Sequence, residues 1–303
     1  MSIKLTLRRS LQAALVAAFS VAALAAAGVA LAETTGAPDA RAASAVAGMT
    51  REEKMSLISG WFGLSLTGAP PPLNLPPPPG ALGSAGYVPG VPRLGIPALQ
   101  EADASLGVSS GMATGPEHRS TPLPSSLATA ASWNLKAAFN GGAMIGSEAH
   151  AKGINVLLAG GVDLEREPRN GRSFEYASED PLLSGIMVGE SIRGIQSRHV
   201  ISTAKHYAVN DQENGRSVVD EIMSEKDLRE SDLLAFEIAL EHGRPGAIMC
   251  AYNKVNGDYA CENAFLLNTV LKHDWGYPGW VMSDWGGTHS TVKIGRASCR
   301  ERV

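Results

Sequence analysis

The chain has 303 residues, of which 44% are hydrophobic and 18% are charged, and its formal net charge is -4. A chain of this length and apolar content can bury a sizeable core. It has no surplus of basic residues, which argues against a nucleic acid partner held through its phosphates.

The N-terminal segment is typical of an export signal. Basic residues at positions 4, 8 and 9 precede an uncharged run from Leu11 to Leu31, and small residues precede Glu33. This pattern predicts a signal peptide over residues 1–32, cleaved after Ala32, and a periplasmic or secreted protein with no membrane partner after cleavage. A retained membrane anchor is the alternative, because the run is long enough to span a bilayer.

The next segment changes from helical to irregular. Residues 37–47 read as a weakly helical lead-in, and Thr50 with Glu53 has the form of a capping box that opens a helix reaching Ile58. From Trp61 to Pro97 the chain is dense in glycine and proline. Such composition predicts a surface loop with polyproline character instead of a helix or a central strand.

Beyond Ile96, apolar runs alternate with helical stretches. The strand candidates are Ala98–Gln100, Ile154–Leu158, Val200–Ala204, Gly246–Cys250 and Trp280–Ser283. The clearest helix is expected from Ser224, as its N-cap, to His242. This α/β alternation predicts a parallel sheet covered on both sides, and the spacing suits a (β/α) barrel. A doubly wound open sheet is the alternative, although no glycine-rich phosphate loop follows the first strand.

The most informative motif is Val281-Met282-Ser283-Asp284-Trp285, an apolar run that ends on an acidic residue. Catalytic side chains of parallel barrels lie at the carboxyl ends of strands, so Asp284 stands where a nucleophile would be presented. A structural aspartate is the alternative. Three further motifs precede it, at residues 165–176, 204–207 and 248–257.

This ordered set of motifs resembles the N-terminal barrel of the family 3 glycoside hydrolases, the group of β-glucosidases and β-xylosidases. The resemblance implies a TIM-type (β/α)8 barrel over residues 33–293 and a retaining, exo-acting β-glycosidase, most simply a β-glucosidase acting on a β-linked oligosaccharide or glucoside. In the β-glucosidase branch the acid/base carboxyl comes from a downstream C-terminal α/β domain. We expect this chain to lack that domain, to leave the barrel incomplete at its C-terminal end, and to be inactive by itself.

The resemblance also implies roles for individual side chains. Asp284 aligns with the nucleophile, Tyr252 with a tyrosine that donates to it, and Trp285 offers an apolar face for a sugar ring. The expected sugar-binding residues are Asp103, Arg166, Lys205 and His206. The family commonly has Asp-Gly-Pro where this chain has Asp103-Ala104-Ser105, so the loop shape there is expected to differ. No cofactor and no metal are implied, because histidines and carboxylates do not cluster at ligand spacings.

Three other functions fit parts of the pattern. A β-xylosidase or β-N-acetylglucosaminidase of the same family is one, although the loop 208–216 lacks the histidine expected for the second. Lys205 at a strand end could form the Schiff base of an aldolase. The third is a non-catalytic sugar-binding module.

The three cysteines allow several interpretations. Cys250 and Cys261 can form a disulfide in an oxidising compartment or remain two buried thiols, and their spacing does not decide between these states. Cys299 lies in residues 294–303, which read as the translation of a sequencing-library adapter. We therefore expect this tail to be an artefact.

Overall fold

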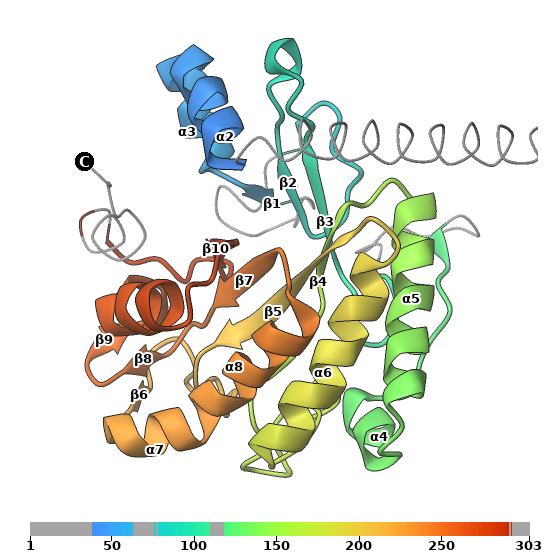
Figure 1. Ribbon diagram of the computed structural model, residues 1–303, viewed down its shortest axis with the longest axis vertical. Helices are drawn as coiled ribbons and strands as arrows, with labels where there is room; N and C mark the ends of the chain where they lie inside the picture. The colour runs from blue at the N-terminus through green and yellow to red at the C-terminus, as the bar shows by residue number, and fades with distance from the viewer. Residues whose placement is uncertain (1–37, 63–75, 77, 110–117, 291, 293–303) are drawn as a thin grey trace, which may run out of the picture. The chain divides into compact units, whose positions relative to one another are not determined.

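The computed structural model describes residues 38–62, 76, 78–109, 118–290 and 292 (Figure 1). The expected signal peptide and the adapter-like tail lie outside the described residues. The chain divides into two compact units, Met1–Ile58 with Val91–Ile96, and Ser59–Gly90 with Pro97–Val303. None of the described helices combines the length and the apolar character needed to cross a membrane.

The first unit is helical where it is described. Its elements are α2 (Pro38–Gly48), α3 (Arg51–Leu57) and the 3-10 helix η1 (Pro92–Leu94). The expected capping box is confirmed: Thr50 Oγ1 accepts from the Glu53 N–H at 3.2 Å, and Glu53 Oε2 accepts from the Thr50 N–H at 2.8 Å. Arg93 Nε donates to Glu53 Oε1 at 2.7 Å, which ties η1 to the start of α3.

The second unit is built on a seven-stranded sheet in the order β1-β2-β3-β4-β5-β7-β10. The strands are β1 (Trp61–Phe62), β2 (Gly86–Val88), β3 (Leu99–Asp103), β4 (Val156–Leu158), β5 (Ile201–Tyr207), β7 (Ala247–Cys250) and β10 (Trp280–Ser283). The run from β3 to β10 is parallel, which confirms all five predicted strands. In this sheet the β1–β2 and β2–β3 pairs are antiparallel.

The prediction of a loop throughout Trp61–Pro97 is wrong in part. The strand β2 lies between prolines but contains none, so its backbone can pair with β3, and all three of its residues are buried. Residues 63–75 and 77 of the predicted loop lie outside the described residues.

The helices cover the outer face of the sheet. They are α4 (Ser126–Ala131), α5 (Leu135–Ala151), α6 (Pro181–Gln196), α7 (Glu225–Glu230), α8 (Asp232–Gly243), the 3-10 helix η3 (Ala260–Glu262) and the π-helix η4 (Phe265–Asp274). Figure 1 shows α5, α6 and α8 side by side along the sheet. A Cβ at Gly142 of α5 would lie 2.1 Å from the Ser191 carbonyl of α6, so only glycine permits this close helix contact.

The single helix predicted from Ser224 to His242 is wrong, because the chain forms α7 and α8 with a break at Ser231 (φ -125°, ψ -91°). The Ser231 hydroxyl donates to the Asp227 carbonyl at 2.7 Å, and the neighbouring Asp232 carboxylate pairs with Arg166. Side-chain bonds of this kind compete with the helical ladder. Ser224 caps α7 as predicted, accepting from the Asp227 N–H at 3.1 Å.

The sheet is buried on both faces. In β4, Leu157 packs into the cluster beneath the helices, whereas Val156 and Leu158 pack with Met249 in the interior cluster. Burial on both faces is typical of a parallel barrel sheet. Within the described residues β1 and β10 are not paired, so the strands form a curled part of a (β/α) barrel.

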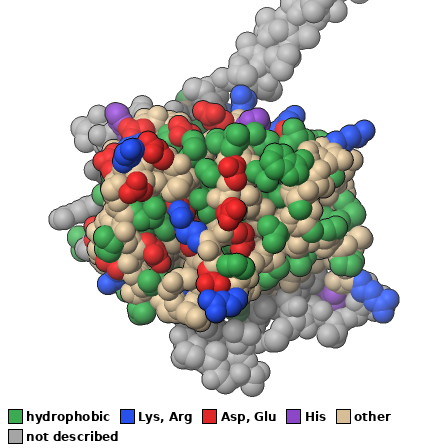
Figure 2. All heavy atoms as spheres, turned by 90° about the horizontal axis from the view of Figure 1, so that it is seen from below, with side chains coloured by type: hydrophobic (Ala, Val, Ile, Leu, Met, Phe, Trp, Pro, Cys, Tyr) green, Lys and Arg blue, Asp and Glu red, His purple; other side chains and the backbone are tan. Residues whose placement is uncertain are grey.

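A small second sheet and a mixed surface complete the second unit. The small sheet joins β6 (Asp220–Glu221), β8 (Lys254–Val255) and β9 (Asp258–Tyr259). On the face shown in Figure 2, acidic and apolar side chains are interspersed with single basic ones, and its described part carries no continuous basic area.

Candidate active site

Asp284 follows the last residue of β10 directly, at the carboxyl end of a parallel strand. Its residue surface is 5% exposed, its Oδ1 accepts from the Trp285 N–H at 2.8 Å, and the Tyr252 hydroxyl donates to its carboxylate. The Asp284 N–H donates to the Cys250 carbonyl at 3.2 Å, which aligns it with the end of β7. The carboxylate is therefore held in one orientation by its own turn and by the neighbouring strand.

Lys205 and His206 come from β5, which extends to Tyr207 and does not stop at Ala204 as predicted. Neighbouring residues of a regular strand face opposite sides. Here the pairing with β7 shifts by one residue between Ala204 and Tyr207, which breaks that alternation. Both side chains lie in the same buried cluster, with residue exposures of 3% and 1%.

Lys205 joins two carboxylates from other elements. Its Nζ lies 3.2 Å from Glu175 Oε2 and 3.9 Å from Oδ1 of Asp103, the last residue of β3. The Asp103 side chain is 57% exposed and the Lys205 side chain only 4%, so Asp103 marks the open edge of the cluster. Ser105, in the segment that departs from the family pattern, donates to Glu175 Oε2 at 2.7 Å.

His206 is held at both ring nitrogens. Arg172 Nη2 lies 2.7 Å from Nε2, and a guanidinium can only donate, so Nε2 is the acceptor and Nδ1 carries the proton. Nδ1 lies 2.9 Å from the Tyr176 hydroxyl and 3.3 Å from Asp163 Oδ2. Burial and the charges of Arg172, Lys205 and Arg216 hold the pKa of His206 well below its usual value, so the ring is neutral.

Arg166 and Arg172 lie in different surroundings. Arg166 Nε donates to Asp211 Oδ2 at 2.7 Å, and its Nη2 pairs with Asp232, so its guanidinium is engaged by two carboxylates. Arg172 contacts His206, and its charge lowers the pKa of Asp284. The sugar-binding role expected of Arg166 stays a prediction, and Arg172 is a second candidate for it.

Tyr252 and Trp285 flank Asp284. Burial, the Asp284 charge and the hydrogen bond to it raise the pKa of the Tyr252 hydroxyl, which remains a donor. Arg216 lies over the Tyr252 ring at 4.5 Å. The Trp285 ring is half-buried and makes an edge contact with Phe62 of β1, with ring centroids 4.9 Å apart.

The cysteine alternatives are resolved in favour of a disulfide. Cys250 and Cys261 are bonded, with Cα atoms 5.1 Å apart. The bond closes the loop that carries Tyr252, and Cys250 also contacts the backbone of β10 through a 3.3 Å bond from Sγ to the Met282 carbonyl. The disulfide therefore holds the Tyr252 loop beside Asp284.

The buried carboxylates of the site have opposite pKa shifts. Burial raises the pKa of Asp284, an effect reduced by its bonds from Tyr252 and Trp285 and by Arg172 and Lys205. Burial alone would also raise the pKa of Glu175, but Lys205, Arg172 and the hydrogen bonds it accepts lower it to about 2. Glu175 is thus a permanent counter-charge, whereas Asp284 keeps a more basic carboxylate, which favours nucleophilic attack.

Asp163 is a buried site residue that the sequence analysis did not single out. Its two carboxylate oxygens accept from the backbone N–H of His206 at 2.6 Å and the backbone N–H of Asn210 at 3.1 Å. Burial raises the pKa of Asp163 to about 7. It lies five residues past the end of β4, in Gly160-Gly161-Val162-Asp163. The rule that favoured Asp284, an acidic residue after a buried strand, also applies here.

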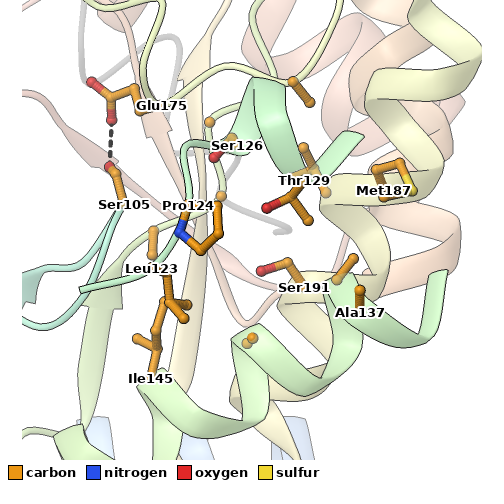
Figure 3. A pocket seen from close by; sticks show the side chains of 18 of the residues that line it. Ser105, Leu123, Pro124, Ser126, Thr129, Ala137, Ile145, Glu175, Met187 and Ser191 are labelled. Atoms are coloured by element: carbon orange, nitrogen blue, oxygen red, sulfur yellow. Dashed lines mark hydrogen bonds between the residues drawn. The ribbon is translucent and has the colours of Figure 1, made fainter. Parts of the chain in front are cut away.

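A separate cavity of about 470 Å³ lies against the outer side of the barrel (Figure 3). The apolar and small side chains of α4, α5 and α6 line it, and Glu175 and Ser105 form part of its wall. Neither Asp284 nor any other side chain expected to bind sugar lines it. A sugar bound at Asp284 would therefore lie elsewhere.

No group of three or more histidine, cysteine or acidic side chains suited to a metal ion occurs in the described residues. The cluster has a buried carboxylate for nucleophilic attack, a neutral imidazole, two cations, and an exposed acidic residue at its edge. Such a set can bind a neutral, hydroxyl-rich ring over Asp284.

Comparison with known proteins identifies the family. The Glycosyl hydrolase family 3 N terminal domain matches residues 90–303. The chain therefore belongs to glycosyl hydrolase family 3, and it contains the N-terminal domain of that family.

The relatives are β-glucosidases. The chain is 42% identical over 203 residues to probable beta-glucosidase K of Emericella nidulans, and 40% identical over 208 residues to thermostable beta-glucosidase B of Acetivibrio thermocellus. These alignments cover 67% of this chain but 24% and 28% of those proteins. Beta-glucosidase 3B of Thermotoga neapolitana, solved with glucose, superposes with a TM-score of 0.78 at 37% identity, covering 85% of this chain and 36% of that one. The chain thus spans about a quarter of the length of the curated relatives, and its strands correspond to part of their TIM-like barrel.

Proposed function

We propose that the protein is a retaining, exo-acting β-glucosidase that removes terminal β-D-glucosyl residues through a covalent intermediate on Asp284. The observation that carries the proposal is the buried Asp284 carboxylate, which accepts from Tyr252 and lies 3.8 Å from His206 Nε2. The β-glucosidase relatives support the substrate class.

In the proposed reaction, Asp284 attacks the anomeric carbon and the glycosidic oxygen leaves with a proton; water then releases the sugar. Lys205, Asp103 and Arg172 bind sugar hydroxyls, and Trp285 stacks on the ring. The acid/base carboxyl, needed about 5 to 5.5 Å from the nucleophile in a retaining enzyme, is proposed to come from a C-terminal α/β domain of the complete protein. The chain by itself is then expected not to turn over substrate.

The test uses a 2-fluoro-β-glucoside with a good leaving group. Incubation of the complete protein should trap one fluoroglucosyl unit per molecule, and peptide mapping should locate it on Asp284. A label on another carboxyl would disprove the proposed nucleophile. Comparing the chain alone with the complete protein, using p-nitrophenyl β-glucoside, tests the origin of the acid/base group.

The Schiff-base alternative is disfavoured by the surroundings of Lys205. Its Nζ lies 3.2 Å from Glu175 and 3.9 Å from Asp103, so the amine is already engaged by two carboxylates. Borohydride trapping of a carbonyl substrate on Lys205 would reverse this conclusion. A non-catalytic module would bind glucose without turnover in the complete protein.

We also propose that the protein is exported to the periplasm or secreted. The Cys250–Cys261 disulfide supports this location, because such bonds persist in oxidising compartments. Cell fractionation of a host expressing the natural gene would test it, and retention of the protein in the cytoplasm would contradict it.

A further inference from the structure

Glu101 is a buried carboxyl near the candidate site to which the proposed mechanism gives no role. It lies in β3, its residue surface is 8% exposed, and its side-chain oxygens have no hydrogen bond or ion pair among the described residues. In the described part of the chain, one side chain forms a hydrogen bond with Glu101: Ser84 donates to its backbone carbonyl. Neither carboxyl oxygen is completely buried, so this carboxyl, which has no partner among the described residues, remains accessible to a ligand.

Glu101 faces the same side of the strand as Asp103. Residues two apart on a strand share a face, and Ala102 between them packs into the cluster beneath the helices. Glu101 and Asp103 therefore face the barrel interior, with Glu101 one layer deeper. Since Asp103 reaches Lys205 at the edge of the site, Glu101 lies on the wall directly below a proposed sugar contact.

Gly86 and Trp285 bound the space around the Glu101 carboxyl. Gly86 is the register partner of Glu101 in β2. A Cβ on Gly86 would lie 2.2 Å from Glu101 Oε2 and 3.0 Å from Trp285 Cη2. The Glu101 carboxyl thus occupies the space that a side chain at residue 86 would need. It lies close to the edge of the Trp285 indole, on which the sugar is proposed to stack.

We propose that Glu101 is a further specificity-determining residue, which binds a hydroxyl of the terminal sugar adjacent to the one bound by Asp103. The proposal rests on the proposed function, because it needs a sugar bound between Asp103 and Trp285. Burial and the Asp103 charge raise the pKa of Glu101 to about 7. Near neutral pH the group can therefore donate as well as accept, and a sugar hydroxyl suits both forms.

The test measures kcat/KM of the complete enzyme with p-nitrophenyl β-glucoside and its 3-, 4- and 6-deoxy analogues. The wild type should lose about 10–100-fold on the analogue that lacks the bound hydroxyl, the range for a hydrogen bond to a charged group. Glu101→Met should lose a similar factor on the parent glucoside and no longer discriminate against that analogue. Equal losses on every substrate would show a structural role and overturn the proposal.

Two further variants and a control keep the test decisive. Gly86→Ala fills the space beside the carboxyl and should weaken discrimination at the same hydroxyl even if Glu101→Met folds poorly. Asp103→Asn should act on a different hydroxyl; if it acts on the same one, Glu101 works only through Asp103 and the proposal is wrong. Glu241→Gln, an exposed change on α8, should leave every ratio unchanged.

Glucose affinity separates this proposal from the proposed function. A wild type that does not cleave the glucoside would disprove the β-glucosidase assignment. Calorimetric titration with glucose would still examine Glu101, because Glu101→Met should weaken binding about 10-fold or more. Unchanged affinity would overturn the role of Glu101 whatever the turnover.

Discussion

Arg166 and Arg172 lie six residues apart in one loop, but they enter charge clusters of different composition. The Arg166 cluster sets one cation against two buried carboxylates, Asp211 and Asp232, each with one oxygen that has no partner among the described residues. In the Arg172 cluster, Arg172 and Lys205 both pair with Glu175, while Asp163 and Asp284 lie beside a neutral histidine. The comparison shows that a buried carboxylate paired with two cations stays ionised, whereas one that shares a single cation with a second carboxylate binds a proton.

The pKa values express this difference. Burial and the charges of Asp232 and Asp163 raise the pKa of Asp211 to about 9, despite its ion pair with Arg166. Glu175, in the Arg172 cluster, has a pKa lowered to about 2. We therefore expect changes in the first cluster to alter stability and changes in the second to alter catalysis.

The largest effect is expected for Asp284→Asn in the complete enzyme. The amide is nearly isosteric but cannot form the covalent intermediate, so kcat should fall by several orders of magnitude. Stability should not fall, because burial disfavours the charge that is removed. Turnover of p-nitrophenyl β-glucoside and thermal unfolding measure the two effects. Near-normal activity would end the assignment of Asp284.

Arg166→Leu should act on stability. It leaves two buried carboxylates without their cation, and breaking a buried ion pair costs about 3–5 kcal/mol; the 45% exposure of the Arg166 side chain favours the lower end. Denaturant unfolding should show the loss, while kcat/KM of the folded fraction changes little. A selective loss of kcat/KM with normal stability would support Arg166 as a sugar-binding residue.

Arg172→Leu should act on catalysis as well as on stability, because it also breaks the buried ion pair with Glu175. Its guanidinium contacts His206 and stabilises the Asp284 carboxylate, so kcat/KM should fall. The fall should correspond to about 2–4 kcal/mol of lost transition-state stabilisation, the range for charged hydrogen bonds in a dry site. Steady-state kinetics next to Arg166→Leu give the comparison directly. If both variants show the same balance of stability and activity, the distinction between the two clusters fails.

The smallest expected effect is a change in the pH dependence of stability in Asp211→Asn. The folded-state pKa of Asp211 is about 9, above that of the unfolded chain, so the wild type loses stability as pH rises from about 4 towards 9. The amide cannot ionise and should flatten this decline between pH 5 and pH 8. Melting temperatures of both proteins across this range measure it, and parallel curves would contradict it.

The sequence predicted the parts of this molecule that depend on local pattern. Apolar runs bounded by polar residues located β4, β7 and β10; every residue of β4 and β7 is buried, and a strand buried on both faces needs an unbroken apolar run. Asp284 was found by its position after such a run. The family match and the barrel-like neighbours confirm the fold class; the roles of the site residues remain predictions.

Features that the sequence did not predict depend on tertiary contacts. Nothing in the spacing of Arg166 and Arg172 states which guanidinium meets His206, because that depends on how the loop folds over β5. The break at Ser231 reflects the pairing of Asp232 with a residue more than sixty positions away. The disulfide was left open for the same reason, since sequence separation does not give the distance between two Cα atoms.

The irregular pairing at the end of β5 has a consequence for how such a site can change. A regular strand contributes one inward side chain for every two residues, but β5 contributes Lys205 and His206 in succession. Deleting one residue between Ala204 and Tyr207 would restore regular pairing between β5 and β7. Only one of the two side chains could then face the site. The number of functional groups at this strand end is therefore set by chain length as well as by residue type, so an insertion or deletion here would alter the site more than most substitutions.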